Sequence, residues 1–268
     1  MLNDTLISNI KDLVKSVGSF QLKHFRHMPK GSDIEKAARD LVSFVDVESE
    51  KKLIEGLSEI LPEAGFFGEE SGRSGNQDLV WIIDPLDGTT NFLNGLDQFS
   101  ISVGLVEEGK TLFGIVYRPF SDETYWASKG QGFFYNDEKQ LLVTSRPLAK
   151  ALVGTGFPYR SADMQKSFFS CAEKVLTSSR GLRRFASAAL DLTYLACGRF
   201  QGFWESDLQP YDVAAALLFL EETGCIVSNE NGEVYDLFTD RIIIVGVPEA
   251  HGQLKGIIGK YYNLKTQD

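Results

Sequence analysis

The stretch Trp81-Ile82-Ile83-Asp84-Pro85-Leu86-Asp87-Gly88-Thr89-Thr90-Asn91-Phe92 joins an apolar run to a turn that carries two carboxylates. The run begins at Leu79, and residues 79–83 are too few for a helix and rich in β-branched and aromatic side chains. They therefore predict a fully buried strand. Asp84 follows where this strand leaves the core. Because Pro85 has no N–H and favours an extended backbone at Asp84, the chain cannot coil directly into a helix there.

The turn after the strand combines acidic side chains with backbone donors. Asp87-Gly88-Thr89-Thr90 has a helix-capping pattern, in which the glycine permits a tight turn and the free N–H groups of a helix start can face an anion. Two carboxylates three residues apart, next to such donors, suit a metal ion that holds a phosphate. An ordinary loop with an aspartate cap is the alternative interpretation of this stretch alone.

The composition limits the class of protein and its partners. The 268 residues are 43% hydrophobic and 24% charged, which predicts a globular chain with a sizeable core. A formal net charge of −10 argues against nucleic acid or an anionic membrane as a partner, and an anionic substrate would need intervening cations. Three cysteines without CxxC spacing fit a reducing compartment. Residues 1–10 lack a signal-peptide pattern and no apolar stretch approaches ~20 residues, so we expect a cytoplasmic protein.

The N-terminal half predicts helices at 4–27 and 47–61, followed by an antiparallel meander. Phe99–Leu105 alternates strictly, which predicts a strand with one buried face and one small polar face. Further strands of the meander are expected at 112–117, 123–127, 132–135 and 140–144.

Two groups of metal-ligand types in this half are better explained as ordinary helix residues. His24 and His27 lie three residues apart, but no third ligand type is near them in the sequence. Asp46, Glu48 and Glu50 superficially match a calcium loop, but such a loop needs Gly where this chain has Lys51. We interpret the three acids as residues of a helix start, where they suit the helix dipole.

The C-terminal half changes to alternating strands and helices. Strands are expected at 152–154, 182–185, 200–204 and 242–245, and helices at 163–176, 187–197, 213–223 and 249–260. Asn231-Gly232 predicts a hairpin turn. Asp212 precedes the helix at 213, where its spacing alone indicates a cap. Arg180, Arg183 and Arg184 form a basic cluster, either solvated or in contact with a phosphate or another subunit.

Taken together, the acidic motifs resemble those of the inositol monophosphatase family, within the superfamily of lithium-sensitive, magnesium-dependent sugar phosphatases. The order and spacing of the motifs agree over nearly the whole chain. The matching residues are Asp40-Leu41-Val42-Ser43 leading to Asp46, Gly68-Glu69-Glu70-Ser71, Asp84 to Phe92, and Tyr211-Asp212-Val213-Ala214-Ala215.

The resemblance implies two or three Mg²⁺ ions and names their ligands. Glu69, Asp84 and the carbonyl of Leu86 would hold one ion. Asp84, Asp87 and Asp212 would hold a second ion. A third, weaker ion would lie by Glu69 through water molecules.

The resemblance also implies catalytic and substrate-binding roles. Thr89, hydrogen-bonded to Asp46, would orient and deprotonate the attacking water together with Glu69. Gly88 and Thr89 would donate N–H groups to the phosphate, and Glu205 would accept hydrogen bonds from substrate hydroxyls. The full set of implied substrate-binding residues is Asp87, Gly88, Thr89, Ser187, Ala188, Glu205 and Asp212.

The implied chemistry suits such a site. Enzymes must accelerate phosphate monoester hydrolysis by up to ~10²¹, whereas a single general base contributes only ~10²–10⁴. A pair of metal ions ~3.5–4 Å apart activates the attacking water and stabilises the leaving oxygen. Magnesium prefers oxygen ligands, and bound cations reconcile an acidic protein with a phosphate substrate.

The sequence departs from the family pattern at three positions that are not metal ligands. Tyr211 replaces the usual Trp, Ala186 stands where Gly is common, and Cys225 replaces the second Gly after the helix at 213–223. A methyl group at Ala186 could narrow the polyol pocket.

Several alternatives stay open. Fructose-1,6-bisphosphate, NADP and histidinol phosphate are substrates of relatives with nearly the same metal motif. Phosphatases that act on 3′-phosphoadenosine 5′-phosphate tend to carry Lys-Glu or a similar pair after Asp-Gly-Thr, whereas Thr90-Asn91-Phe92 favours the inositol phosphate branch. An aspartyl-phosphate mechanism is disfavoured, because it needs acids two residues apart. A second class of function is a regulatory or interaction protein with a vestigial site, since some bacterial relatives are thought to act on RNA machinery.

We expect an α/β fold in which residues 1–146 form an α+β half and residues 147–268 an α/β half of one catalytic unit. The resemblance narrows this to a layered αβαβα sandwich, and it implies a homodimer inhibited by lithium. The expected partner is a small sugar or polyol phosphate, and the site should lie where the halves meet.

Overall fold

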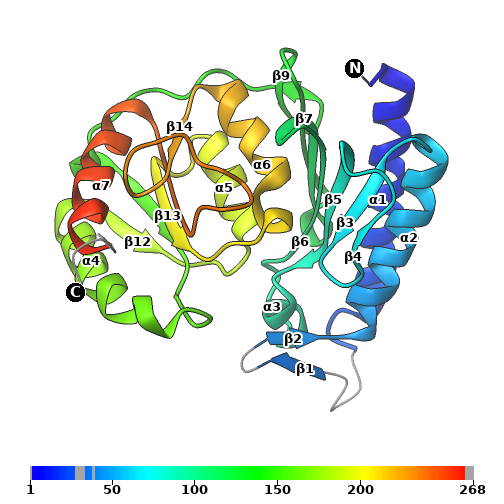
Figure 1. Ribbon diagram of the computed structural model, residues 1–268, viewed down its shortest axis with the longest axis horizontal. Coiled ribbons are helices and arrows are strands. Elements are labelled where there is room, and N and C mark those ends of the chain that lie inside the picture. The colour runs from blue at the N-terminus through cyan, green and yellow to red at the C-terminus, as the bar shows by residue number, and fades with distance from the viewer. Residues whose placement is uncertain (1, 28–33, 38–39, 263–268) are drawn as a thin grey trace.

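The computed structural model describes residues 2–27, 34–37 and 40–262, which form a layered sandwich (Figure 1). From one side to the other lie a helix pair, a large sheet, a second helix pair, a smaller sheet and a third helix pair. This is the predicted αβαβα architecture, in which each sheet face buries the apolar face of a helix. The predicted boundary at residue 146 stays a prediction.

The large sheet contains eight strands within the described part of the chain. They are β3 (Gly65–Gly68), β4 (Gly72–Ser74), β5 (Leu79–Asp87), β6 (Ser100–Glu107), β7 (Lys110–Arg118), β8 (Glu123–Ser128), β9 (Gly132–Tyr135) and β10 (Glu138–Lys139). Their order is β10-β9-β8-β7-β6-β5-β3-β4, and β3 runs parallel to β5 while the other neighbours are antiparallel. The predicted buried strand is therefore β5, and it continues past Ile83 to Asp87.

Two amphipathic helices, α1 (Asp4–His24) and α2 (Phe44–Ile60), cover the outer face of this sheet. Helix α2 begins three residues earlier than predicted because Ser43 caps it. The Ser43 hydroxyl accepts the Val45 N–H at 3.2 Å, and the carboxylate of Asp46 accepts the Ser43 N–H at 2.9 Å. A short antiparallel pair, β1 (Ile34–Ala37) and β2 (Asp40–Val42), precedes it.

The middle layer consists of α5 (Ala188–Ala196) and α6 (Pro210–Thr223). Every residue of α5 is buried, and most of α6 is apolar on all sides, as expected of helices enclosed between two sheets. Two glycines of the large sheet, Gly104 and Gly114, let it approach α6 closely. A Cβ at Gly114 would lie only 2.5 Å from the carbonyl oxygen of Ala215.

The face of β6 that carries Ser100, Ser102 and Gly104 is small and polar as predicted, but the expectation that only the opposite face is buried is wrong. Ser100 and Ser102 are 0 and 1% exposed, because α6 covers the face on which they lie. Their small side chains, with Gly104, make room for the α6 backbone. The small residues in this alternating pattern are therefore explained by close packing against α6 and not by exposure to solvent.

The smaller sheet has the strand order β12-β11-β13-β15-β14. The strands are β11 (Leu152–Thr155), β12 (Gly181–Arg183), β13 (Gly202–Ser206), β14 (Ile226–Ser228) and β15 (Ile242–Gly246). Strand β11 pairs in parallel with β12 and β13, whereas β15 is antiparallel to β13 and β14. Helices α4 (Gln165–Ser178) and α7 (Pro248–Tyr261) cover its outer face.

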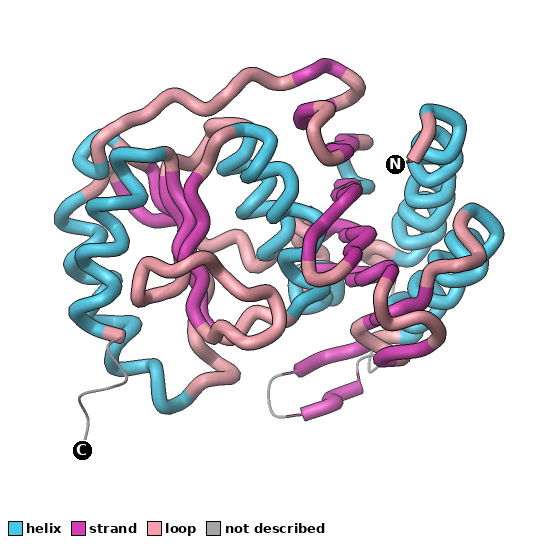
Figure 2. The backbone as a smooth tube through the Cα atoms, turned by 45° about the horizontal axis from the view of Figure 1, so that its top comes forward, coloured by secondary structure: helices cyan, strands magenta, loops and turns pink. Residues whose placement is uncertain are grey.

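Two predicted features of the connecting segments differ. Residues 140–144 form no strand but cross from the large sheet to the smaller half as a long loop, visible in Figure 2. The Gln140 N–H still bonds to the Phe133 carbonyl of β9, but the Val143 N–H bonds to the carbonyl of Thr223 at the end of α6, so the segment leaves the sheet instead of forming a further strand. Asn231-Gly232 does form a turn, but it does not join two strands directly. The antiparallel strands on either side, β14 and β15, are connected by the longer segment 229–241.

The remaining helical pieces are short. Helix α3 (Thr89–Leu93) follows β5 directly, and 3-10 turns lie at Pro119–Ser121, Leu148–Lys150 and Ala162–Met164. Within the described ranges, none of the helices combines the length and apolar character needed to cross a membrane.

Candidate active site

Three carboxylates from distant parts of the chain meet at one point. Asp84 and Asp87 lie at the end of β5, and Asp212 lies in the first turn of α6. One oxygen of each lies within 4.8 Å of the others, and the side chains are 2, 8 and 9% exposed respectively. The family resemblance implied that these residues share one metal site, and the fold brings them together.

Glu69 completes the acidic cluster from the turn after β3. Its N–H donates to the Ile83 carbonyl at 3.1 Å, which continues the parallel pairing of β3 with β5 and places Glu69 beside Asp84. Burial raises the pKa of Asp84 well above its ordinary value, and the neighbouring carboxylates of Glu69, Asp87 and Asp212 raise it further.

This electrostatic arrangement fits a divalent cation. Burial and the nearby Asp87 carboxylate raise the pKa of Asp212 to about 8, although the N–H of Gln209 bonds to it. Crowded buried carboxylates repel one another unless positive charge lies between them. The available donors are carboxylate oxygens and the carbonyl of Leu86, which lines the same cavity, and magnesium prefers ligands of this type.

The turn after β5 has the backbone geometry that its sequence requires. Gly88 has φ of 98°, in the left-handed region, and a Cβ there would lie 2.8 Å from the Gln98 carbonyl oxygen. Thr89 then starts α3, and its hydroxyl donates to the carboxylate of Asp46 at 2.8 Å. This is the contact that the family resemblance implied. Burial raises the pKa of Asp46, against the opposing hydrogen bonds from Ser43 and Thr89.

Asp87 is held in place by the start of α5. The Ser187 hydroxyl and the Ala189 N–H donate to the Asp87 carboxylate at 2.6 and 2.8 Å, and the Ala188 N–H approaches it at 3.3 Å. Ala188 lines the cavity, whereas Ser187 is fully buried behind it. Ser187 therefore reaches the site through Asp87, and its role in binding a substrate stays a prediction.

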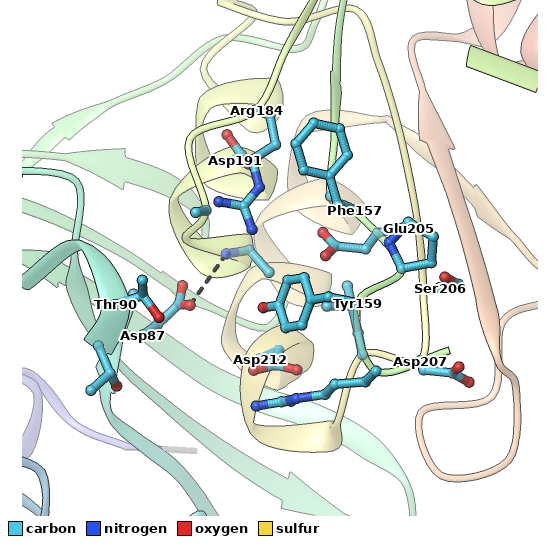
Figure 3. Close-up of a pocket in the computed structure, with 18 of the residues that line it drawn as sticks. Asp87, Thr90, Phe157, Tyr159, Arg184, Asp191, Glu205, Ser206, Asp207 and Asp212 are labelled. Carbon is cyan, nitrogen blue, oxygen red and sulfur yellow. Dashed lines mark hydrogen bonds between the residues drawn. The ribbon is translucent and has the colours of Figure 1, made fainter. Parts of the chain in front are cut away.

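The carboxylates open into a cavity of about 290 Å³ between the two sheets. Figure 3 shows Asp87 and Thr90 on one side and Phe157, Tyr159 and Glu205 on the other. Burial and the neighbouring Asp191 raise the pKa of Glu205 to about 8, against the opposing charge of Arg184. The cavity therefore has an acidic end, formed by Asp84, Asp87 and Asp212, and a polar end around Glu205 that holds both acidic and basic side chains.

Several residues of the polar end were missed or left open by the sequence reasoning. Arg184 lines the cavity with its guanidinium 5.4 Å from the Phe157 ring and 5.8 Å from the Tyr159 ring, whereas Arg180 and Arg183 do not line it. Arg160 was missed because it lies in a loop without a local signal. Asp191 could have been found as a lone acid in an apolar helix, and burial raises its pKa well above the ordinary value.

Comparison with known proteins agrees with this geometry. The sequence profile of the inositol monophosphatase family matches residues 3–262. The chain belongs to this family. It is 35% identical over 223 residues to the inositol-1-monophosphatase of Caulobacter vibrioides, covering 82% of this chain and 87% of the relative. It is 34% identical over 218 residues to the Nus factor SuhB of Xylella fastidiosa, covering 81% and 79%.

Solved structures of the inositol monophosphatase family share the fold. The extragenic suppressor protein suhB of Bartonella henselae superposes with a TM-score of 0.90 at 33% identity, covering 96% of this chain and 99% of that chain. The Thermotoga maritima IMPase superposes with a TM-score of 0.87 at 27% identity, covering 97% and 99%.

Departures from the family pattern have local explanations. Ala186 lines the cavity with φ of 64°, a left-handed conformation that glycine adopts freely and that costs other residues ~1–2 kcal/mol. Tyr211 packs its ring edge-on against Phe67, with centroids 6.1 Å apart, so it still fills the start of α6. Cys225 follows the end of α6 and does not line the cavity.

Proposed function

We propose that this protein is a magnesium-dependent phosphatase that hydrolyses a small polyol phosphate monoester, with a myo-inositol monophosphate as its substrate. The observation that carries the proposal is the convergence of Asp84, Asp87 and Asp212 at one end of a polar cavity. Membership in the inositol monophosphatase family supports it, as do relatives that bear the name inositol-1-monophosphatase.

The candidate ligands are Glu69, Asp84, the Leu86 carbonyl, Asp87 and Asp212. Bound Mg²⁺ would neutralise the phosphate, acidify the attacking water and stabilise the leaving oxygen. Hydrogen bonds already fix the two central carboxylates, since the Leu86 N–H donates to Asp84 at 3.0 Å and the start of α5 holds Asp87. Such outer hydrogen bonds orient metal ligands and tune their affinity.

Thr89 and Glu69 are the proposed water-orienting pair. Because the Thr89 hydroxyl donates its proton to Asp46, its oxygen lone pairs remain available to accept a hydrogen bond from a water molecule. Glu69, which lines the same cavity, would take the water's proton. The N–H groups of Gly88 and Thr89 would hold the phosphate.

The far end of the cavity suits hydroxyl groups. Glu205 and Asp191 can accept hydrogen bonds, and Arg160 and Arg184 can donate them, so a neutral polyol finds partners of both kinds. A second phosphate would meet two guanidinium groups as well as two carboxylates there, so the charges at this end do not exclude a bisphosphate. Fructose-1,6-bisphosphate, NADP, histidinol phosphate and 3′-phosphoadenosine 5′-phosphate remain the alternative substrates.

Phosphate release from myo-inositol 1-phosphate, with and without Mg²⁺, tests the proposal. We expect magnesium-dependent turnover that falls by at least ~10²-fold in Asp87→Asn, because the variant loses the charge of one candidate ligand and part of its fixed hydrogen bonding. The exposed Asp78 offers a matched control, and Asp78→Asn should keep wild-type activity. A panel that includes the four alternative substrates, ranked by kcat/KM, identifies the preferred one. Absence of turnover on all five would refute the proposal.

A second candidate function is a regulatory role, because relatives at similar identity bear the name Nus factor SuhB. A strain that lacks the gene would separate the two functions. If the inactive Asp87→Asn protein restored the wild-type phenotype to that strain, the regulatory role would be favoured. The family resemblance also leads us to infer a homodimer, which light scattering on the purified protein tests.

A further inference from the structure

Helix α2 carries two buried carboxylates one turn apart. Asp46 and Glu50 are 1 and 2% exposed, and residues four apart lie on the same helix face. Asp46 accepts the Thr89 hydroxyl, as described above. Glu50 faces a different segment of the candidate site, the turn between β3 and β4.

Both carboxylate oxygens of Glu50 accept hydrogen bonds from that turn. The Glu70 N–H donates to Oε2 and the Ser71 N–H donates to Oε1, each at 2.8 Å. These two N–H groups directly follow Glu69 in the chain. Because each oxygen accepts from one donor, the carboxylate fixes the orientation of the turn as well as its position, and hydrogen bonds to a charged acceptor are strong.

The backbone before Glu69 is shaped to admit this carboxylate. A Cβ at Gly68 would lie 2.4 Å from Glu50 Oε2 and 2.5 Å from its carboxyl carbon, so only glycine leaves room for Glu50 beneath the turn. Glu69 is thus held on both sides, by its own N–H to the Ile83 carbonyl and by Glu50 through the next two residues.

We propose that Glu50 is a positioning residue for the candidate metal site: it holds the turn so that Glu69 faces Asp84. One face of α2 then sets two parts of the site at once, since Asp46 orients Thr89 from the preceding turn of the helix. This inference rests on the proposed function. It assigns Glu50 no contact with substrate or metal, and Asp84, Asp87 and Asp212 keep their positions without it.

Magnesium affinity is the readout that separates positioning from general stabilisation. We compare wild type, Glu50→Gln and Glu50→Ala by calorimetric titration with Mg²⁺ and by the Mg²⁺ concentration that half-saturates phosphate release from myo-inositol 1-phosphate. Loss of a residue that supports a metal ligand weakens metal binding by about 10- to 100-fold, and we expect both measures to shift by such a factor. Glu50→Gln preserves the side-chain shape, so it serves if Glu50→Ala does not fold.

Two further variants complete the design. Gly68→Ala should reproduce the shift, because its Cβ displaces the Glu50 carboxylate without removing it. Glu55→Gln, exposed on the same helix, should leave Mg²⁺ affinity unchanged. An affinity for Mg²⁺ in Glu50→Gln within about twofold of wild type, with or without a lower melting temperature, would overturn the inference alone. A wild-type protein that neither binds Mg²⁺ nor releases phosphate would instead overturn the proposed function.

Discussion

The substitution Gly156→Ala should damage substrate selection without damaging the fold. Gly156 follows β11 and lines the cavity beside Glu205, whose strand β13 pairs with β11. A Cβ at position 156 would lie 1.7 Å from Glu205 Oε1 and 2.0 Å from its carboxyl carbon. Gly156 does not need a left-handed backbone, and the displaced atoms end a flexible side chain, so the melting temperature should stay close to that of the wild type.

The size of the effect follows from the displacement. Ordinary van der Waals contact begins near 3.4 Å, so the Glu205 oxygen has to move by about 1.7 Å. Because a misplacement of ~1 Å can cost ~10²-fold in rate, we expect kcat/KM for myo-inositol 1-phosphate to fall about 100-fold, or ~2.7 kcal/mol. Hydrolysis of p-nitrophenyl phosphate, which has no hydroxyl groups for Glu205 to bind, should change little.

The assay measures kcat/KM for both phosphates in wild type, Gly156→Ala and Glu205→Gln, with Gly256→Ala as the control. A Cβ at Gly256 meets no atom within 4 Å, so that variant should behave as wild type. If both substrates are lost equally in Gly156→Ala, the cavity has collapsed and the reasoning about Glu205 is wrong. An unchanged ratio of the two in Glu205→Gln would show that Glu205 does not select hydroxyls.

Three other predictions address metal binding, pH and packing. Mg²⁺ should raise the melting temperature of wild type but not of Asp84→Asn, while the metal-free melting temperature of Asp84→Asn should equal or exceed that of wild type, because a crowded buried charge is removed. Burial would raise the pKa of Glu123, but hydrogen bonds from the hydroxyl groups of Ser121, Tyr135 and Tyr125 and from Arg118 lower it from 4.5 to about 2. Its contribution to stability is therefore present above pH 4.5 and lost as pH falls towards 2, so acid denaturation of Glu123→Gln should show a shallower loss in that range. Gly114→Ala should cost roughly 1–3 kcal/mol in urea unfolding through overpacking against the Ala215 backbone, and a smaller loss would mean that the sheet can shift away from α6.

The local pattern of the sequence predicted most elements but misjudged the two places where tertiary contacts decide. Residues 140–144 have the composition of a strand, yet after the Gln140 N–H bond to β9 the segment leaves the sheet, and the Val143 N–H bonds to the end of α6. The small polar residues of β6 suggested a face that is not buried, whereas α6 packs against that face. Propensity describes what one segment favours, and exposure depends on what packs against it.

The candidate site was likewise predicted only in part from the local sequence. Asp84 and Asp87 both lie at the end of β5, just before the turn at Gly88, so the sequence by itself determined that a buried strand ends on two neighbouring carboxylates. Spacing alone indicated that Asp212 was a cap, and the resemblance to a family assigned it to the metal.

Only the tertiary structure decided which distant residues support that turn. The carboxylates of Glu50 and Asp46, one helix turn apart, hold the segments of Glu69 and Thr89, and Ser187 holds Asp87 from a position 100 residues away. Strand register and helix packing create these contacts, and neither is encoded in the spacing of residues within one segment. The stretch from Trp81 to Phe92 thus specified its own shape and its acids, while the helices and sheets around it determined what those acids can hold.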